Sequence, residues 1–304
     1  MIFPEKLQKG DIIGLIAPSS PITKEEAFLC EKFIKDRGYQ VKLGNSIYRS
    51  IHGYCAGTGE ERAKEINKMF QDKEIKAIFC TRGGYSSCHM MDKIDYEMIR
   101  KNPKIFVGYS DVTNLNVVFN QRCDLVTFHG PMVKSNLIYR QEDFTKKSFQ
   151  EAIYMEKELL LKNPPGEELK VLIGGIAEGM IVGGNLSLLT SMIGTPYEVN
   201  TRGKILFIEE VEEKIHHIDR MMYQLKYAKK LEQAEGILFG DFTNCENFYD
   251  KNYKVIDLLK DVLKGYKKPV MYNIRSGHCF PMVTIPLGSK CIVNTNDKEI
   301  KFVR

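Results

Sequence analysis

Residues 104–111 read Lys-Ile-Phe-Val-Gly-Tyr-Ser-Asp, and this stretch is the most informative one in the chain. The short apolar run at 105–107 predicts a buried strand that ends in a small polar turn. Apolar residues then recur at helical spacing and predict an amphipathic helix directly after the turn: Val112, Leu115, Val118 and Phe119. Ser110 would therefore lie between a strand and a helix, where free backbone N–H groups of the first helical turn can stabilise an oxyanion.

This arrangement has the geometry of a nucleophile elbow, although its residues do not match the G-x-S-x-G signature. A structural explanation is also open, because serine and aspartate are preferred residues for capping a helix. Ser110 and Asp111 are both placed to do so. The stretch therefore needs support from other parts of the chain before it indicates catalysis.

The first half of the chain alternates strands and helices. An apolar strand at Ile12–Ala17 is followed by a Thr23/Glu26 capping box, and a second capping box precedes the helix after residue 58. Repeated βα units predict a parallel sheet with helices on both faces. Ligands gather at the carboxyl ends of such strands. The turns expected at that edge contain Ser19, Gly83-Gly84, Ser110 and His129.

The composition of the sequence changes near residues 157–168, which read Lys-Glu-Leu-Leu-Leu-Lys-Asn-Pro-Pro-Gly-Glu-Glu. We interpret this segment as a linker between an N-terminal α/β domain, residues 1–156, and a C-terminal domain, residues 169–304. Beyond it the glycines cluster, and the predicted strands are short and separated by turns. The last residues, 290–303, are predicted to form a hairpin.

The composition is that of a soluble globular protein, with 43% apolar and 27% charged residues among 304. A formal charge of +5 on scattered lysines argues against a nucleic-acid partner. The sequence contains neither a signal peptide nor an apolar run of the roughly 20 residues that span a bilayer. Eight cysteines without a C-x-x-C pair favour reduced thiols in a cytoplasmic protein. No membrane partner, metal or cofactor is expected.

Two later strand ends carry the residues that would support Ser110. The strand at Ile205–Ile208 ends in Glu209-Glu210, and a carboxylate there can fix the tautomer of a histidine. The strand near Ile274 ends in a Gly277-His278 turn, which can present a general base. Solvated carboxylates and a loop histidine bonded to backbone are the structural alternatives. Together these positions supply a nucleophile, an acid and a base.

The chain resembles the LD-carboxypeptidase family, serine peptidases that include muropeptide carboxypeptidases and the microcin C immunity enzymes. The resemblance extends from Gly10 almost to the C-terminus. It rests on segments that occur in one order along the chain: Ile16-Ala17-Pro18-Ser19-Ser20, Arg82-Gly83-Gly84-Tyr85, Gly108-Tyr109-Ser110-Asp111-Val112-Thr113, His129-Gly130-Pro131-Met132, Gly183-Gly184-Asn185-Leu186-Ser187-Leu188-Leu189, Phe207-Ile208-Glu209-Glu210, Ile218-Asp219-Arg220-Met221, Gly277-His278 and Thr284-Ile285-Pro286-Leu287-Gly288.

The resemblance implies a flavodoxin-like N-terminal domain joined to a smaller, β-rich C-terminal domain. It implies Ser110 as nucleophile, His278 as general base and Glu209 as the carboxylate that orients it. Glu209 is preferred to Glu210 because the family's acid directly follows the apolar strand residues. The nucleophile then comes from one domain, and the acid and base come from the other. A homodimer is implied as well.

The implied reaction is acyl transfer to Ser110, with the oxyanion held by the backbone N–H groups of Gly84 and Asp111. Arg82 is a candidate for binding the terminal carboxylate of the substrate, and a structural salt bridge is its alternative role. Asn185 is a weaker candidate for substrate binding, since the residue can equally cap the following helix.

Three functions remain open from the sequence. The first is removal of D-alanine from a muropeptide tetrapeptide, which the Ile-Asp-Arg-Met stretch at 218–221 favours by resemblance. The second is hydrolysis of aminoacyl-nucleotides, a branch that typically stacks the base on tryptophan, which this chain lacks. The third is a non-catalytic protein that binds a small ligand. The identity of the third peptide residue, and whether the peptide is free or linked to sugar, are undetermined.

Two other residue groups do not predict a site. The adjacent His216 and His217 face different directions on a helix, and no third metal ligand is suitably spaced. Cys80 and Cys88 flank the glycine turn, but the sequence offers neither an adjacent base that would make it a nucleophile.

Overall fold

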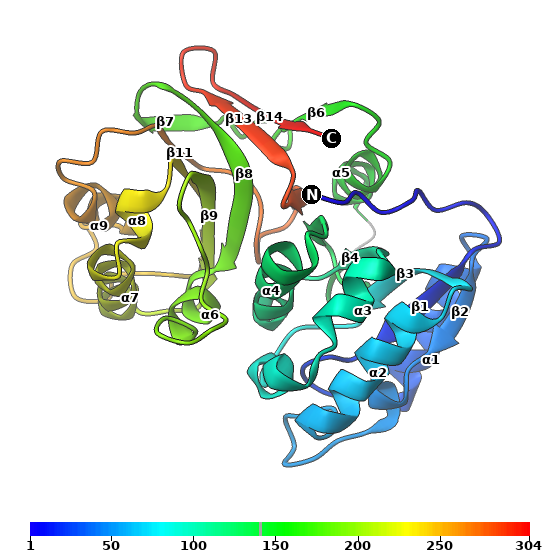
Figure 1. Cartoon of the computed structure of the whole chain (residues 1–304). Coiled ribbons are helices and arrows are strands. Elements are labelled where there is room, and N and C mark those ends of the chain that lie inside the picture. The colour runs from blue at the N-terminus through cyan, green and yellow to red at the C-terminus, as the bar shows by residue number, and fades with distance from the viewer. Residues whose placement is uncertain (140–141) are drawn as a thin grey trace. The chain divides into compact units, whose positions relative to one another are not determined.

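The computed structural model describes residues 1–139 and 142–304. The chain divides into two compact units, Met1–Tyr154 and Met155–Arg304, of nearly equal length. Most helices and strands of the two units are labelled in Figure 1. A mixed α/β architecture with a parallel sheet in the first unit and a second sheet in the other confirms the predicted fold class.

Parallel strands form the sheet of the first unit, in the order β5-β4-β3-β1-β2. This is the flavodoxin-like order, in which ligands bind beyond the carboxyl ends of the strands. The strands are β1 (Ile12–Ile16), β2 (Gln40–Leu43), β3 (Ile75–Cys80), β4 (Ile105–Val107) and β5 (Thr127–His129).

Helices connect these strands and cover the sheet (Figure 1). The α-helices are α1 (Lys24–Lys35), α2 (Gly59–Gln71), α3 (Tyr96–Lys101), α4 (Thr113–Cys123) and α5 (Asp143–Ile153). Shorter helical turns are η1 (Asn45–Tyr48), η2 (Ser87–Lys93), η3 (Ser110–Val112) and η4 (Val133–Leu137). Both predicted capping boxes are confirmed, because the Thr23 and Thr58 side chains accept from the third helical residue, whose glutamate accepts in return.

Helix α4 differs from the amphipathic helix that the sequence predicts. It is buried on nearly all sides, and its buried residues include three asparagines. Two of their amide groups donate hydrogen bonds within the unit: Asn116 to the Gly108 carbonyl at 2.9 Å and Asn120 to the Leu125 carbonyl at 2.7 Å. A helix surrounded by protein keeps polar residues only where each finds a hydrogen-bond partner. The helix that follows Ser110 is therefore bonded to the segment before it, at Gly108, and to the segment after it, at Leu125.

Aromatic packing forms the core behind β4. The rings of Phe106 and Phe119 meet edge to face with centroids 4.9 Å apart, and Phe70 of α2 contacts Phe119 with centroids 5.4 Å apart. All three side chains are completely buried. Edge-to-face contacts between buried rings add to the stabilisation from burial itself, by about 0.5–1.5 kcal/mol per pair. This cluster anchors the strand that leads to Ser110.

The sheet of the second unit has the order β6-β14-β13-β8-β9-β10-β11-β7. Strands β8 to β11 are parallel, and the outer strands pair antiparallel. The strands are β6 (Glu158–Leu160), β7 (Lys170–Ile173), β8 (Ile176–Asn185), β9 (Lys204–Val211), β10 (Gly236–Thr243), β11 (Val270–Tyr272), β13 (Lys290–Asn294) and β14 (Glu299–Val303). The unit also contains β12 (Ile285–Leu287), α6 (Leu186–Ser191), α7 (Ile215–Tyr227), α8 (Lys230–Gln233) and α9 (Val255–Val262).

The predicted C-terminal hairpin is confirmed as β13 and β14, which pair from Lys290 with Val303 to Asn294 with Glu299. The segment 157–168, which we expected to be a linker, instead contains β6. That strand extends the sheet by pairing with β14, Leu160 opposite Lys301. The sequence did not predict this strand, because an edge strand of three residues buries little apolar surface and needs no apolar pattern. Among the described residues, no helix combines the length and apolar character needed to cross a membrane.

Candidate active site

Ser110 lies at a sharp turn between β4 and α4. Its φ of 63° falls in the left-handed region, which residues other than glycine rarely adopt. Such a conformation costs on the order of 1–3 kcal/mol and persists only where surrounding structure imposes it, as it often does at active sites. The three-residue turn η3 begins at Ser110, and α4 follows directly. The strand-to-helix position that the sequence predicts is therefore present.

The Gly83-Gly84 turn at the end of β3 lies directly against Ser110. A Cβ at Gly83 would come within 2.7 Å of the Ser110 Cβ and within 2.9 Å of its Oγ. Gly84 has a φ of 128°, and a Cβ there would collide with the side chain of Ser20. Both positions therefore require glycine, one for the close approach and the other for its backbone conformation as well. Two of the strand ends expected to converge do meet here.

Asp111 connects the serine turn to the segment after the glycines. Its buried carboxylate accepts from the Ser87 backbone N–H at 2.9 Å, while the Ser87 hydroxyl donates to the Asp111 carbonyl at 2.7 Å. The Asn114 amide donates to that same hydroxyl at 3.1 Å. Burial raises the pKa of Asp111, although the hydrogen bonds with Ser87 and the charge of Arg62 oppose the shift. These bonds fix the two segments whose backbone N–H groups were predicted to hold the oxyanion.

Arg62 of α2 reinforces the same region, and the sequence analysis missed it. The guanidinium is 1% exposed and donates to backbone carbonyls of Gly57, Pro18 and Ser86, with 3.2 Å to Ser86 and 3.1 Å to Gly57. Burial lowers its pKa, while the charge of Asp111 acts in the opposite direction. Its burial could have been inferred from the sequence, because Arg62 lies four residues before Ile66 and so shares the apolar face of the helix. An arginine buried on the apolar face of a helix needs hydrogen-bond acceptors from other segments.

Arg82, predicted to bind a carboxylate, is half-buried beside the glycine turn. Its Nε donates to the carbonyl of the adjacent Gly83 at 3.3 Å. The role in binding substrate stays a prediction. His129, the fourth residue expected at this edge, is completely buried, with its ring centroid 5.5 Å from that of Tyr109.

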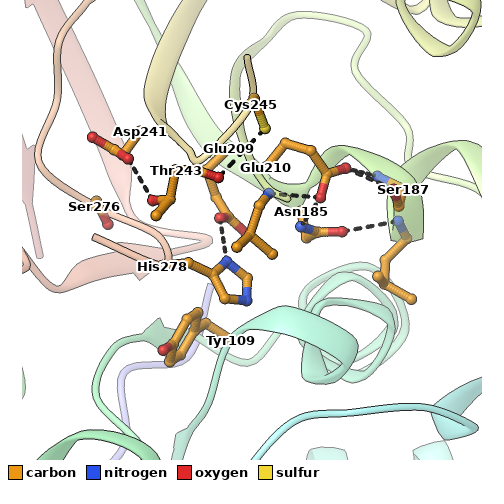
Figure 2. Close-up of polar contacts among 12 residues, drawn as sticks. Tyr109, Asn185, Ser187, Glu209, Glu210, Asp241, Thr243, Cys245, Ser276 and His278 are labelled. Atoms are coloured by element: carbon orange, nitrogen blue, oxygen red, sulfur yellow. Dashed lines mark hydrogen bonds and ion pairs between the residues drawn. The ribbon is translucent and has the colours of Figure 1, made fainter. Parts of the chain in front are cut away.

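In the second unit, Glu209 and His278 form a hydrogen-bonded pair (Figure 2). The Oε2 atom of Glu209 lies 2.8 Å from Nδ1 of His278, and the side chains are 0% and 17% exposed. Burial on its own would lower the pKa of His278. The charge of Glu209 and its hydrogen bond, with smaller contributions from Glu210 and Glu212, outweigh burial and raise the pKa above its ordinary value of 6.5. The carboxylate thus makes this imidazole a stronger base.

Gly277 makes that pairing possible. Its φ is 121°, and a Cβ at this position would come within 2.5 Å of Oε2 and 2.9 Å of Cβ of Glu209. Any side chain here would strain the backbone and push the carboxylate away from the imidazole. In the Gly-His dipeptide, Gly277 therefore leaves room for the Glu209 carboxylate, and His278 binds that carboxylate.

Glu210, the other carboxylate at this strand end, has a different role. It accepts from the Asn185 amide at 2.8 Å, from the Ser187 N–H at 2.8 Å and from the Ser187 hydroxyl at 2.7 Å (Figure 2). Burial raises its pKa, although these bonds oppose the shift. Side chains of neighbouring residues point to opposite faces of a strand, so only one of the two glutamates contacts His278.

Asn185 caps helix α6, as the structural alternative proposed. Its Oδ1 accepts from the Leu188 N–H at 3.3 Å, and its amide is committed to Glu210. The parallel register of β8 and β9 sets Asn185 opposite Glu209. The approach of these strands requires Gly183, where a Cβ would collide with the Phe207 carbonyl. A contact between Asn185 and substrate stays a prediction.

Residues that the sequence analysis set aside have other partners. His217 pairs with Glu213 through Nδ1 at 2.7 Å, and the ring of His216 lies beside that of Tyr249, with centroids 5.6 Å apart. Over residues 1–139 and 142–304, no three His, Cys, Asp or Glu side chains gather as a group that could hold a metal. Cys80 is fully buried, and burial raises the pKa of its thiol.

Comparison with known proteins shows the same two-part organisation. The sequence model of the LD-carboxypeptidase N-terminal domain matches residues 13–130, and that of the LD-carboxypeptidase C-terminal domain matches residues 178–293. A probable murein peptide carboxypeptidase of Bacillus subtilis is 41% identical over 297 residues, which cover 97% of this chain and 92% of that protein.

The microcin C7 self-immunity protein MccF of Escherichia coli is 30% identical over 327 residues, covering 97% of this chain and 94% of MccF. The solved structure of MccF in its wild-type apo state aligns with a TM-score of 0.92 over 100% of this chain and 99% of that one, at 26% identity. A muramoyltetrapeptide carboxypeptidase from Oxalobacter formigenes aligns with a TM-score of 0.84 at 26% identity, covering 95% and 97% of the two chains.

Proposed function

The chain belongs to the LD-carboxypeptidase family, and from this premise we propose that it removes the C-terminal D-alanine from murein tetrapeptides. The observation that carries the proposal is the pair formed by Glu209 and His278, a buried carboxylate 2.8 Å from an imidazole whose pKa it raises. The strained turn at Ser110 supports it from the other unit. The identity to a murein peptide carboxypeptidase indicates the substrate class.

In the proposed reaction, Ser110 attacks the carbonyl carbon of the bond that precedes D-alanine, and His278 accepts the hydroxyl proton. Serine requires such a base because its free hydroxyl is a weak nucleophile near neutral pH. Glu209 holds Nδ1 of the imidazole protonated and stabilises the imidazolium that forms. His278 then protonates the leaving amine of D-alanine, and water attacks the acyl-enzyme with the same histidine as base.

Backbone N–H groups of Gly84 and Asp111 would stabilise the oxyanion. The contact of Gly83 with Ser110 and the bonds between Ser87 and Asp111 support this assignment, because they hold the two segments together. Loss of one such donor costs on the order of 100- to 1,000-fold in rate. We assign the terminal carboxylate of the substrate to Arg82, whose guanidinium lies beside the same turn.

A second candidate is the hydrolysis of aminoacyl-nucleotides. The fold similarity to MccF, including its solved complex with aspartyl sulfamoyl adenosine, favours this alternative. The identity to the murein peptide carboxypeptidase is higher, at 41% against 30%, and this chain contains no tryptophan. We therefore rank the murein peptide first.

We further propose that the protein is a cytoplasmic homodimer, as its family resemblance implies. All eight cysteines lie in the described part of the chain, and each is a free thiol. Seven of them are buried, where they pack as small apolar residues. Free thiols are typical of proteins from reducing compartments, which supports the proposed location.

The experiment that tests the proposed function is mass spectrometry of the purified protein with L-Ala-D-Glu-diaminopimelate-D-Ala. The lysine-containing peptide and an aminoacyl-nucleotide are run in parallel. We expect tripeptide and free D-alanine from the wild type and neither product from Ser110→Ala. Cleavage of the aminoacyl-nucleotide alone would select the second candidate, and equal activity of Ser110→Ala would remove the assigned nucleophile.

A further inference from the structure

Three exposed aromatic rings gather on the first unit beyond the glycine turn. Tyr54 is 46% exposed and Tyr85 is 68% exposed, and their rings meet edge to face with centroids 6.4 Å apart and an interplanar angle of 84°. His52, also exposed, lies beside Tyr54 with ring centroids 6.3 Å apart. Single exposed aromatic residues are common, whereas a contiguous group indicates a binding surface.

The backbone holds this group in a defined place. Ile51 and Cys55 form a tight hairpin through two backbone hydrogen bonds of 2.9 and 3.1 Å, and Tyr54 lies within it. The next residue, Ala56, donates to the Ser19 carbonyl at 2.9 Å. The hairpin is thereby attached to the end of β1, at the same edge of the sheet as the serine turn.

Tyr85 is attached to that edge independently. Its backbone N–H donates to the Ser20 hydroxyl at 3.3 Å, and it directly follows Gly84. Its Cα lies at most about 7 Å from that of Gly83, because two residues span no more than that. Gly83 in turn contacts Ser110. The exposed ring therefore projects from the turn that adjoins the assigned nucleophile.

We propose that Tyr54 and Tyr85 bind the sugar of a sugar-linked murein peptide. The inference rests on the proposed function and extends it, since it states which form of the peptide the enzyme prefers. The ligand class is a pyranose ring joined to the N-terminal end of the peptide. The assignment makes both tyrosines specificity residues, with no part in the chemical step.

The surface of a pyranose and the surface of the two tyrosines are chemically complementary. A pyranose presents an apolar face of C–H groups and a rim of hydroxyls, while tyrosine presents an apolar ring and a phenolic hydroxyl that forms hydrogen bonds. Two rings at 84° form a corner, which suits a ring with thickness such as a pyranose chair.

The length of the substrate agrees with this placement. Three residues lie between the scissile bond and the sugar, and an extended chain of three α-linked residues spans about 10 Å, which the γ-linkage of D-glutamate lengthens. The backbone of Tyr85 is separated from Gly83 by at most about 7 Å, and its side chain extends the reach further. A peptide whose acyl group is at Ser110 can therefore bring its sugar to the tyrosine pair.

Kinetics on two substrates test the proposal. We would measure kcat/KM for the free tetrapeptide and for the same peptide linked to N-acetylmuramic acid. The wild type is expected to prefer the linked peptide by about 5- to 10-fold, the order of one aromatic contact. The Tyr54→Ala/Tyr85→Ala double variant should lose this preference and keep its rate on the free peptide within about 2-fold. Phenylalanine at both positions should retain most of it.

Tyr48 provides the matched control. It is 57% exposed and belongs to η1, a few residues before the hairpin. Tyr48→Ala should leave the preference unchanged. Equal rates of the wild type on both peptides would overturn the proposal. So would an equal loss on both substrates in the double variant, which would assign the tyrosines to the peptide or to folding.

A binding measurement separates this inference from the proposed function. Saturation-transfer NMR of Ser110→Ala with N-acetylmuramic acid alone needs no turnover. We expect saturation of the sugar ring protons, and its loss in the Ser110→Ala variant that also lacks both tyrosine rings. If the wild type cleaves neither peptide but the sugar still binds through the tyrosines, the proposed reaction fails and the sugar site stands. Absence of saturation overturns the sugar site, whatever the activity.

Discussion

At Glu209, a single carboxylate controls the basicity of His278. The glutamate is completely buried at the end of β9, and its charge and hydrogen bond raise the pKa of the imidazole against the effect of burial. A general base must be neutral to accept a proton. The activity of the wild type should therefore rise with pH as His278 deprotonates, with a midpoint above 6.5.

Glu209→Gln should lower activity and also move this midpoint. Without the charge, burial remains, and burial lowers the pKa of histidine, so the acid limb of the kcat/KM profile should shift to lower pH. The rate should fall on the order of 1,000- to 10,000-fold, because the tautomer is no longer fixed.

Glu212→Gln is the matched control, since this exposed glutamate acts on His278 only through a smaller charge interaction. It should shift the midpoint in the same direction by less and leave the maximal rate within about 2-fold. A Glu209→Gln profile with an unchanged midpoint would contradict the assigned pair.

At the scale of elements, buried side chains join three segments at one edge of the first sheet by hydrogen bonds. The turn after β1, the segment after the glycines and the start of α4 share bonds through the buried side chains of Asp111 and Arg62. Neither side chain is assigned a contact with substrate. Both act through backbone groups, which makes them positioning residues for the oxyanion N–H groups.

Asp111→Asn should therefore reduce kcat more than it changes KM. The amide keeps the volume but loses the charge opposite Arg62 and weakens the bond from Ser87, so the oxyanion donors are less well aligned. We expect kcat to fall about 10- to 100-fold, less than the loss of a whole donor, with KM within about 3-fold.

Asp95→Asn makes the same chemical change at the N-cap of α3, where asparagine caps as well as aspartate, and should leave kcat unchanged. If Asp111→Asn raised KM and left kcat intact, the positioning role would be wrong.

At the scale of the whole molecule, one mass-spectrometry experiment measures both the number of free thiols and the oligomeric state. Native mass spectrometry of protein isolated with a thiol-blocking reagent should give twice the 34.9 kDa of one chain, before the mass of the reagent is added. After denaturation in the same reagent, each chain should carry eight blocked thiols, because all eight cysteines are free. A monomer would contradict the proposed dimer. Fewer than eight blocked thiols, from cells lysed in the reagent, would contradict the proposed compartment.

Local patterns in the sequence predicted the elements that depend on neighbouring residues. Capping boxes at Thr23 and Thr58 involve residues three apart, and the terminal hairpin follows from two strands around one turn. The parallel sheet of the first unit followed from repeated βα units, and the positions of Ser110, Glu209 and His278 at strand ends followed from where apolar runs stop. Each of these signals lies within a window of a few residues.

Only the tertiary structure decided which distant groups meet. It brought Glu209 to His278, 69 residues away in the sequence, a choice over Glu210 that the local pattern left open and that the family resemblance alone favoured. It buried Arg62 and nearly all sides of α4, and it added β6 to a sheet through β14. Burial and strand pairing depend on contacts between segments far apart, and the same local pattern is compatible with many of them. The chain's own sequence therefore determined its elements and the residues at their ends, while long-range packing determined which of those residues act on one another.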